Sequence, residues 1–290
     1  MAGSGQVRAV TAAFYPPRRH PNLSTPIVAH VASDKRAHVL AVANQKGGVA
    51  KTTTVVSLAA ALAERDLDVL VIDLDAQACA TFSLGLDPED LVDTGSRVLL
   101  GGRPPTREDV TRLIRPTDEG VWLLPAAIDL AGADRALADT SGREYAVRAV
   151  VEPIRSDYDW VLLDCSPSLG IITIAALTAA DDVIIPLQCE TLSHRGVGQL
   201  MDTIADVQRL TNPELKIAGV LPTLFDGRTT HARSVLADLG PRYDVRVLPP
   251  ISRSVRFAEA PAVGRSILST AGSSKGADDY RKLADVLLAG

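Results

Sequence analysis

A short apolar run, residues 38–43, leads directly into the sequence Asn44-Gln-Lys-Gly-Gly-Val-Ala-Lys-Thr-Thr-Thr54. An apolar strand, a turn with two glycines and a helix N-terminus together point several backbone N–H groups at one spot, and the positive end of the helix dipole faces the same place. The glycines allow the backbone to curl and leave room for a phosphate. The pattern therefore predicts a phosphate-binding loop that consists of Gly47, Gly48, Val49, Ala50, Lys51, Thr52 and Thr53.

The side chains of this loop predict a nucleotide and a metal ion. Lys51 is expected to reach the β- and γ-phosphates, and the Thr52 hydroxyl is expected to hold Mg²⁺. The usual pattern GxxxxGK[ST] is not met, because Gln45 and Ala50 occupy its two glycine positions. Lys46 leaves the loop in another direction and can reach a nucleotide in a facing subunit, as an arginine finger does. The alternative for Lys46 is an ordinary solvated lysine.

The rest of the chain alternates between short apolar runs and longer segments of helical character. Such an alternation predicts an α/β fold in which a doubly wound, mostly parallel sheet carries helices on both faces. Aromatic residues make up 4% of the chain, so the core must rest on aliphatic side chains, as buried parallel strands do. The expected strands are residues 38–43, 68–73, 121–124, 160–164, 182–186, 216–221 and 245–248. The expected helices are residues 52–65, 171–179, 196–210, 229–239 and 277–288.

Carboxylates follow two of the expected strands. Asp73 and Asp75 lie at the end of the second strand, where the alternation of a strand places both on one side. Asp164 follows four apolar residues, as in a Walker B strand whose last residue meets the metal shell. The sequence thus predicts Thr52, Asp73 and Asp164 as metal-site residues. An aspartate after a strand is also a common turn former, which is the alternative interpretation.

Composition bounds the remaining classes. Residues 1–37 contain four prolines and no periodicity, and they carry five basic residues against one acid, so we expect a flexible basic arm followed by one domain at 38–290. The three cysteines form no CxxC pair, which argues against a disulfide framework and favours a reducing cytoplasm. No signal peptide and no apolar run of membrane-spanning length is present, and the last helix carries charges of both signs, so no membrane partner is expected. The net charge is −5, yet residues 225–270 hold seven arginines against four acids, a local patch that can meet a polyanion.

The motifs resemble those of the ParA/Soj branch of the deviant-Walker ATPases, which are relatives of MinD. Residues 44–54 resemble the signature loop of this branch, and the similarity covers about residues 38–288. Further segments that resemble the branch are Asp73–Gln77, Pro125–Ala133, Leu163–Gly170, Ile185–Glu190, Phe225–Thr229 and Arg256–Pro261.

The resemblance implies a DNA-segregation ATPase that uses ATP and Mg²⁺. It implies an ATP-sandwiched homodimer in which Lys46 crosses to the partner's nucleotide and Asp75 positions the hydrolytic water. It also implies slow hydrolysis that a ParB-like activator stimulates, binding of non-specific DNA, and a nucleoid-associated place in the cytoplasm. The DNA-contacting residues of the family correspond here to Arg228, Arg253 and Arg256, for which a structural ion pair is the alternative.

The chain departs from the family pattern at several positions. Ala50 replaces a glycine, and an alanine forced to a positive φ there costs about 1 kcal/mol. Ala76, Ala78 and Cys79 alter a motif of the type Asp-Pro-Gln-Gly-Asn. Ser166 and Ser252 stand where prolines are usual.

Three other functions stay open at this stage. A MinD-like membrane-positioning ATPase requires a basic amphipathic C-terminal helix, and a reductase like the nitrogenase iron protein requires cysteines that share a cluster across the dimer. A ParA-like positioner of a protein cargo uses the same ATP cycle with another partner.

Overall fold

The computed structural model describes residues 36–188 and 193–290. The predicted arm therefore lies, as far as residue 35, outside the described residues. Arg36 and Ala37 already belong to the folded domain, because Arg36 pairs with Glu152 at 2.5 Å and the buried Ala37 donates its N–H to the Arg155 carbonyl.

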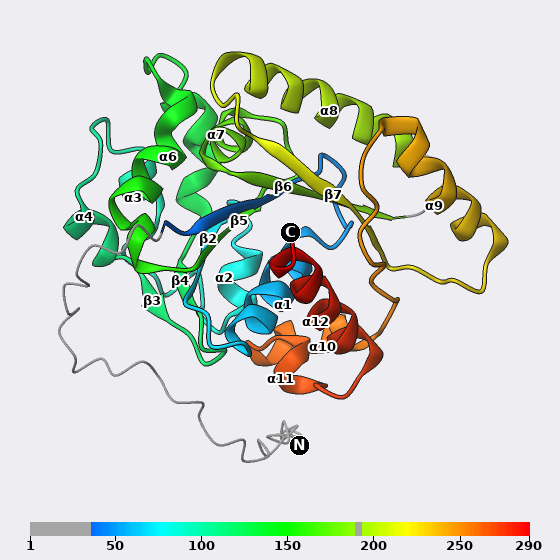
Figure 1. The fold of residues 1–290 in the computed structure, drawn as a ribbon. Helices are drawn as coiled ribbons and strands as arrows, with labels where there is room; N and C mark the ends of the chain where they lie inside the picture. The colour runs from blue at the N-terminus through cyan, green and yellow to red at the C-terminus, as the bar shows by residue number, and fades with distance from the viewer. Residues whose placement is uncertain (1–35, 189–192) are drawn as a thin grey trace, which may run out of the picture.

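The sheet has the order β3-β4-β2-β5-β1-β6-β7, with β1 near its centre. All neighbouring strands pair in parallel except β3 and β4 (Figure 1). The strands are β1 (His38–Val42), β2 (Val69–Leu74), β3 (Arg115–Pro116), β4 (Trp122–Leu124), β5 (Trp160–Cys165), β6 (Asp182–Gln188) and β7 (Lys216–Thr223). The doubly wound, mostly parallel sheet predicted from the sequence is thereby confirmed.

Helices cover both faces of this sheet. The α-helices are α1 (Lys51–Ala63), α2 (Cys79–Ser83), α3 (Ser96–Leu99), α4 (Arg107–Thr111), α5 (Ala133–Ala136), α6 (Ala146–Val151), α7 (Ile171–Ala179), α8 (Ser193–Leu210), α9 (Thr230–Tyr243), α10 (Arg256–Glu259), α11 (Ile267–Thr270) and α12 (Lys275–Leu288). The described residues also include four short 3₁₀ helices: η1 (Ile128–Gly132), η2 (Arg143–Tyr145), η3 (Glu152–Asp157) and η4 (Pro261–Val263).

The parallel strands divide their side chains between two apolar cores. In β1, Val39 and Ala41 belong to the core beneath α6, α7 and α8, whereas Leu40 and Val42 belong to the core beneath α1, α11 and α12. Successive side chains of a strand point to opposite faces, so a run that is apolar at every position is buried on both sides. This double burial explains why the strands read as continuous apolar runs in the sequence.

The last helix closes one face of the sheet. Tyr280 and Leu283 of α12 are fully buried in the same core as α1, and the Tyr280 hydroxyl lies 3.1 Å from Thr54 Oγ1. Arg281 pairs with Glu64 of α1 at 2.7 Å. The apolar side of α12 is therefore occupied by its own domain.

Two strand predictions differ from the structure. Residues 245–248 form only an isolated bridge, Val247 to Val220, and Pro249 and Pro250 that follow have no N–H to extend a ladder. β3 was not predicted, because a two-residue strand that ends in Pro116 has no apolar run to mark it.

Candidate nucleotide site

The glycine-rich loop lies at the carboxyl end of β1 and leads into α1, as predicted. Its start is held by Asn44, whose side-chain amide donates to the Pro186 carbonyl of β6 at 2.6 Å and whose Oδ1 accepts the Lys46 N–H at 2.9 Å. Its end is held by Thr223 of β7, which donates to the Val49 carbonyl at 2.9 Å. Neighbouring strands thus position the loop, and Asn44 and Thr223 are functional positions that the sequence did not single out.

Two residues of the loop take the left-handed backbone conformation. Gly48 has a φ of 74° and Ala50, the N-cap of α1, has a φ of 67°. Ala50 thus has the positive φ for which the sequence predicts a penalty, and its side chain lowers the stability of the folded loop by about 1 kcal/mol. Ala78, which precedes α2 in the altered second motif, has a φ of 51°. Both alanines stand where the family pattern has glycine.

A large cavity lies in front of the loop, with a volume of about 1080 Å³. This volume accommodates a nucleotide, since pockets for small ligands span about 300–1000 Å³. Seven of the predicted residues line it: Gly47, Gly48, Ala50, Lys51, Thr52, Thr53 and Asp75. Val49 is buried beneath the loop and does not line the cavity.

Lys51 is positioned at the base of this cavity. Its ammonium donates to the Lys46 carbonyl at 3.1 Å, across the curl of the loop, and only 7% of the residue is exposed. Burial lowers the pKa of Lys51, and the carboxylates of Asp164 and Asp75 oppose this effect. Lys46 itself is half-buried and does not line the cavity of its own chain.

Thr52, which lines the cavity, contacts the buried Asp164 behind it. The Thr52 hydroxyl donates to Asp164 Oδ2 at 2.8 Å, whereas Asp164 Oδ1 is buried and has no hydrogen-bond partner. Burial, together with the nearby Asp73 and Asp75, raises the pKa of Asp164 well above its ordinary value. An orphaned buried carboxylate oxygen beside a hydroxyl is a fitting partner for a hard cation such as Mg²⁺.

Asp73 pairs with Asp164 across β2 and β5, so the two carboxylates lie on neighbouring strands. Both oxygens of Asp73 are already engaged: Oδ1 accepts the Asp75 N–H at 3.1 Å, and Oδ2 accepts the N–H and the hydroxyl of Thr81. Burial raises the pKa of Asp73 to about 6, although the Thr81 hydrogen bonds oppose it. The side chain that the sequence placed in the metal shell thus anchors α2 through Thr81, a residue that no motif marked.

The mouth of the cavity is apolar and was not predicted. Phe82 and Ile128 line it and are 49% and 71% exposed, and Pro167 and Pro261 lie beside them. Cys79 is exposed there too, whereas Cys165 is buried and its pKa is raised by burial. Exposed apolar side chains around a polar cavity are typical of a surface that another molecule covers.

The three predicted DNA-contacting arginines lie on the surface, and the structure brings Arg228 and Arg253 together near the end of β7. Asp226 accepts two hydrogen bonds from Arg228, at 2.9 and 2.8 Å, and an isolated bridge from Phe225 to Ser252 places Arg253 beside them. Arg256 pairs with Glu259 at 2.7 Å within α10. All three side chains are exposed, Arg228 by 90%.

Ser252, where the family pattern has proline, has a structural role of its own. Its N–H donates to Asp279 of α12 at 2.9 Å, a bond that proline lacks the donor to make. This departure therefore ties the Arg253 segment to the last helix.

Comparison with known proteins agrees with this geometry. A family model described as an AAA domain matches residues 37–217. The chain is 43% identical over 252 residues to the chromosome-partitioning ATPase Soj of Thermus thermophilus. The matched region covers 86% of this chain and 95% of the relative. It is 40% identical over 248 residues to the sporulation initiation inhibitor protein Soj of Bacillus subtilis, over 85% and 96% of the two chains.

The chain belongs to the ParA/Soj family of P-loop ATPases. Among solved structures, a Mycobacterium smegmatis protein named cobyrinic acid a,c-diamide synthase, with a bound ATP analogue and magnesium, is 53% identical. It superimposes with a TM-score of 0.76 over 87% of this chain and 94% of the other. This neighbour thus shares the fold described above.

No helix in residues 36–188 and 193–290 is both long and apolar enough to span a bilayer.

Proposed function

We propose that this protein is an ATPase that dimerises around ATP, binds non-specific DNA and drives the segregation or positioning of chromosomal or plasmid DNA. One observation carries the proposal: Lys51, Thr52 and Asp75 line one cavity at the end of β1, and Thr52 donates to the buried Asp164, whose other oxygen has no hydrogen-bond partner. The similarity to proteins named for chromosome partitioning, which covers 86% of this chain, supports the biological role.

Nucleotide binding follows from the loop. The backbone N–H groups of Gly47–Thr53 and the Lys51 ammonium would hold the phosphates, and Thr52 with Asp164 would hold Mg²⁺. Among the described residues, no group of three or more His, Cys, Asp or Glu side chains can hold a metal alone, so phosphate oxygens must complete the site. Bound Mg²⁺ would supply neutralisation of the charge that develops on the phosphates.

Hydrolysis requires a group that orients water, and Asp75 is the proposed one. Its carboxylate is half-buried in the cavity wall, where its Oδ1 accepts the Gln77 N–H at 3.0 Å. Lys46 would act in the facing subunit, since it does not line the cavity of its own chain. Phe82 and Ile128 at the mouth offer the apolar rim that such a facing subunit would cover.

DNA binding is assigned to Arg228, Arg253 and Arg256. Two of them form exposed ion pairs, which solvent screens, so these pairs can be exchanged for contacts to DNA phosphates at little cost. A ParB-like activator would stimulate hydrolysis, and the protein would act in the cytoplasm on the nucleoid. A ParA-like positioner of a protein cargo would use the same residues with another partner.

Two other assignments are less well supported. A MinD-like membrane role needs a C-terminal helix with a free apolar side, whereas α12 packs that side against α1. Synthesis of an amide, which the name of the mycobacterial neighbour implies, needs a nitrogen donor, commonly released by a nucleophilic thiol. The described cysteines do not suit that task, because the pKa of each is raised: at Cys79 by partial desolvation and the nearby carboxylates of Asp75, Asp73 and Asp164, and at Cys165 by burial.

The test compares two lysines of one loop. Lys51→Ala is expected to abolish the thermal stabilisation that Mg-ATP gives, whereas Lys46→Ala is expected to keep it and to lose ATP-dependent dimerisation in analytical ultracentrifugation. Asp75→Ala is expected to bind ATP and to slow hydrolysis by a factor on the order of 10². Equal stabilisation of the wild type and the Lys51→Ala variant by Mg-ATP would refute the nucleotide site.

A further inference from the structure

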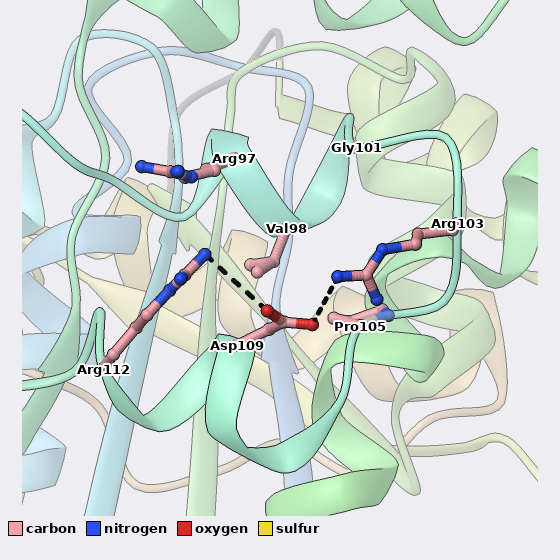
Figure 2. A pocket seen from close by; sticks show the side chains of 7 residues that line it. All are labelled: Arg97, Val98, Gly101, Arg103, Pro105, Asp109 and Arg112. Carbon is pink, nitrogen blue, oxygen red and sulfur yellow. Dashed lines mark hydrogen bonds and ion pairs between the residues drawn. The ribbon is translucent and has the colours of Figure 1, made fainter.

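A second, smaller cavity is lined by residues of α3, of the end of α4 and of the loop between them. Figure 1 shows these two helices on the same side of the molecule as β3 and β4. Its volume is about 210 Å³, and it shares no lining residue with the nucleotide cavity. Three arginines line it, each from a different place: Arg97 from α3, Arg103 from the following loop, and Arg112 from the end of α4. Figure 2 shows the Arg103 and Arg112 side chains on opposite sides of the Asp109 carboxylate, whereas the Arg97 side chain lies above them and points away from Asp109.

The positive charge of this cavity exceeds its negative charge. Asp109 is the one carboxylate in the lining, against three guanidinium groups. Arg97 pairs with Asp93, which lies outside the lining, and an exposed pair of this kind contributes only about 0–1 kcal/mol, so it releases Arg97 easily.

The Asp109 carboxylate is largely committed to other donors. Its Oδ2 accepts the N–H and the hydroxyl of Thr106, both at 3.0 Å, and the Arg103 guanidinium at 2.9 Å. Arg112 approaches its Oδ1 only to 3.7 Å, which is beyond hydrogen-bond distance. The capping box that Thr106 and Asp109 form at the start of α4 explains why Asp109 is there.

The arginines retain donors that these contacts do not use. Each guanidinium carries five N–H donors. The Arg112 side chain donates no hydrogen bond to any residue of the described chain. The three side chains are 54%, 65% and 51% exposed, so a ligand can reach them from solvent.

The shape of the cavity depends on one small residue. A side chain at Gly101 would place its Cβ 2.8 Å from the Arg97 carbonyl oxygen, so only glycine fits there. The turn at Gly101 allows the chain to fold back and to bring Arg103 opposite Arg97 and Arg112 (Figure 2).

We propose that this pocket, formed by Arg97, Arg103 and Arg112, is an anion site for a phosphomonoester dianion. A phosphomonoester carries a charge of about −1.5 to −2 near neutral pH and three acceptor oxygens, which match several guanidinium groups at once. A carboxylate carries a single charge and two oxygens and leaves part of the site unmatched. The cavity volume of about 210 Å³ is below the range of about 300–1000 Å³ that is usual for whole small ligands, but it is large enough for a phosphate group.

The experiment measures binding of inorganic phosphate and O-phosphoserine by calorimetry. It uses the Lys51→Ala background, which removes phosphate binding at the nucleotide loop and keeps this test independent of the proposed ATPase function. We expect saturable binding that Arg112→Gln, and separately Arg103→Gln, weakens at least about tenfold, the loss expected for one charged contact. Arg209→Gln, a change in an exposed arginine paired with Asp206, serves as the control and is expected to leave the affinity unchanged.

A variant of opposite sign sharpens the test. Asp109→Asn removes the negative charge from the pocket and is expected to tighten phosphate binding, while an asparagine oxygen can still cap α4. Opposite shifts in affinity distinguish an anion site from a purely structural cluster, in which both changes would affect only stability.

Three results would overturn the proposal: no saturable phosphate binding in the Lys51→Ala background, equal weakening by Arg209→Gln, or acetate that binds as tightly as phosphate. Within a positive result, a phosphoserine peptide that binds more tightly than the free ion identifies a phosphorylated protein as the source. Equal affinities identify a small phosphorylated metabolite.

Discussion

Ala50 and Ala78 are two residues at which a single side chain introduces backbone strain beside the nucleotide cavity. Both have a positive φ and both border the nucleotide cavity. In this region the Cβ crowds the backbone, whereas glycine is unstrained. The chain therefore carries local strain on two sides of the same site.

Replacing each alanine by glycine is expected to relieve that strain. Ala50→Gly and Ala78→Gly should each raise the free energy of unfolding by about 0.5–1 kcal/mol, as measured in urea titrations. Ala205→Gly in the exposed side of α8 is the matched control, and it should lower the free energy of unfolding by about 1 kcal/mol. Destabilisation by all three changes would contradict the assigned backbone conformation.

The titration of Asp109 is the second consequence at the residue scale. Hydrogen bonds from the Thr106 backbone and side chain, followed by Arg103, lower the pKa of Asp109 to about 2. A carboxyl whose folded pKa is depressed contributes stability above its unfolded pKa and loses it as the pH falls to the folded value. We therefore expect the contribution of Asp109 to disappear between about pH 4 and pH 2.

Carbon-13 NMR of the aspartate carboxyls measures this pKa directly. Asp109→Asn should make the loss of stability below pH 4 shallower than in the wild type, and Thr106→Ala should move the pKa of Asp109 upward. A titration of Asp109 at its ordinary value would disprove the assigned hydrogen bonds.

At the scale of elements, α12 packs against α1 and stabilises it. Its apolar side is buried against α1 and α11, and two ion pairs, Arg281 with Glu64 and Arg65 with Asp285, join α12 to α1. Because α1 begins with the phosphate loop, the packing of α12 supports the element that positions Lys51.

Leu283→Ala tests the packing of α12 against α1. The change leaves a cavity between α12 and the α1 core and should lower the free energy of unfolding by about 2–5 kcal/mol. Leu288→Ala, at the exposed end of the same helix, is the control and should change stability by less than about 0.5 kcal/mol. Similar losses in both variants would show that α12 is not docked as described.

For the whole molecule, the strength of DNA binding should depend on the number of arginine–phosphate contacts. If Arg253 neutralises one phosphate of duplex DNA, then Arg253→Ala should reduce the slope of log affinity against log salt by about 1. Arg209→Ala should leave the slope unchanged. The measurement is a fluorescence-anisotropy titration with random duplex DNA and Mg-ATP at several salt concentrations.

Local pattern was sufficient for much of the fold and the core of the site. The apolar runs of the central strands, the Gly47-Gly48 turn and the Lys51-Thr52 pair are contiguous in sequence, and their geometry follows from strand, turn and helix-start preferences. They therefore predicted the doubly wound sheet and the loop at the end of β1. The pattern missed β3, because a two-residue strand is too short to show periodicity, and it wrongly predicted a strand at residues 245–248, which form only an isolated bridge.

What the chain's own pattern could not supply were contacts between residues far apart in sequence. Asp73 and Asp164 become neighbours only because β2 and β5 pair in register, and Asp73 is drawn to Thr81 rather than to the cavity by the position of α2. Arg97, Arg103 and Arg112 line one cavity only once the loop between α3 and α4 has folded back. A local motif specifies backbone conformation and residue type, whereas the free energy of packing across the whole domain selects which distant side chains meet.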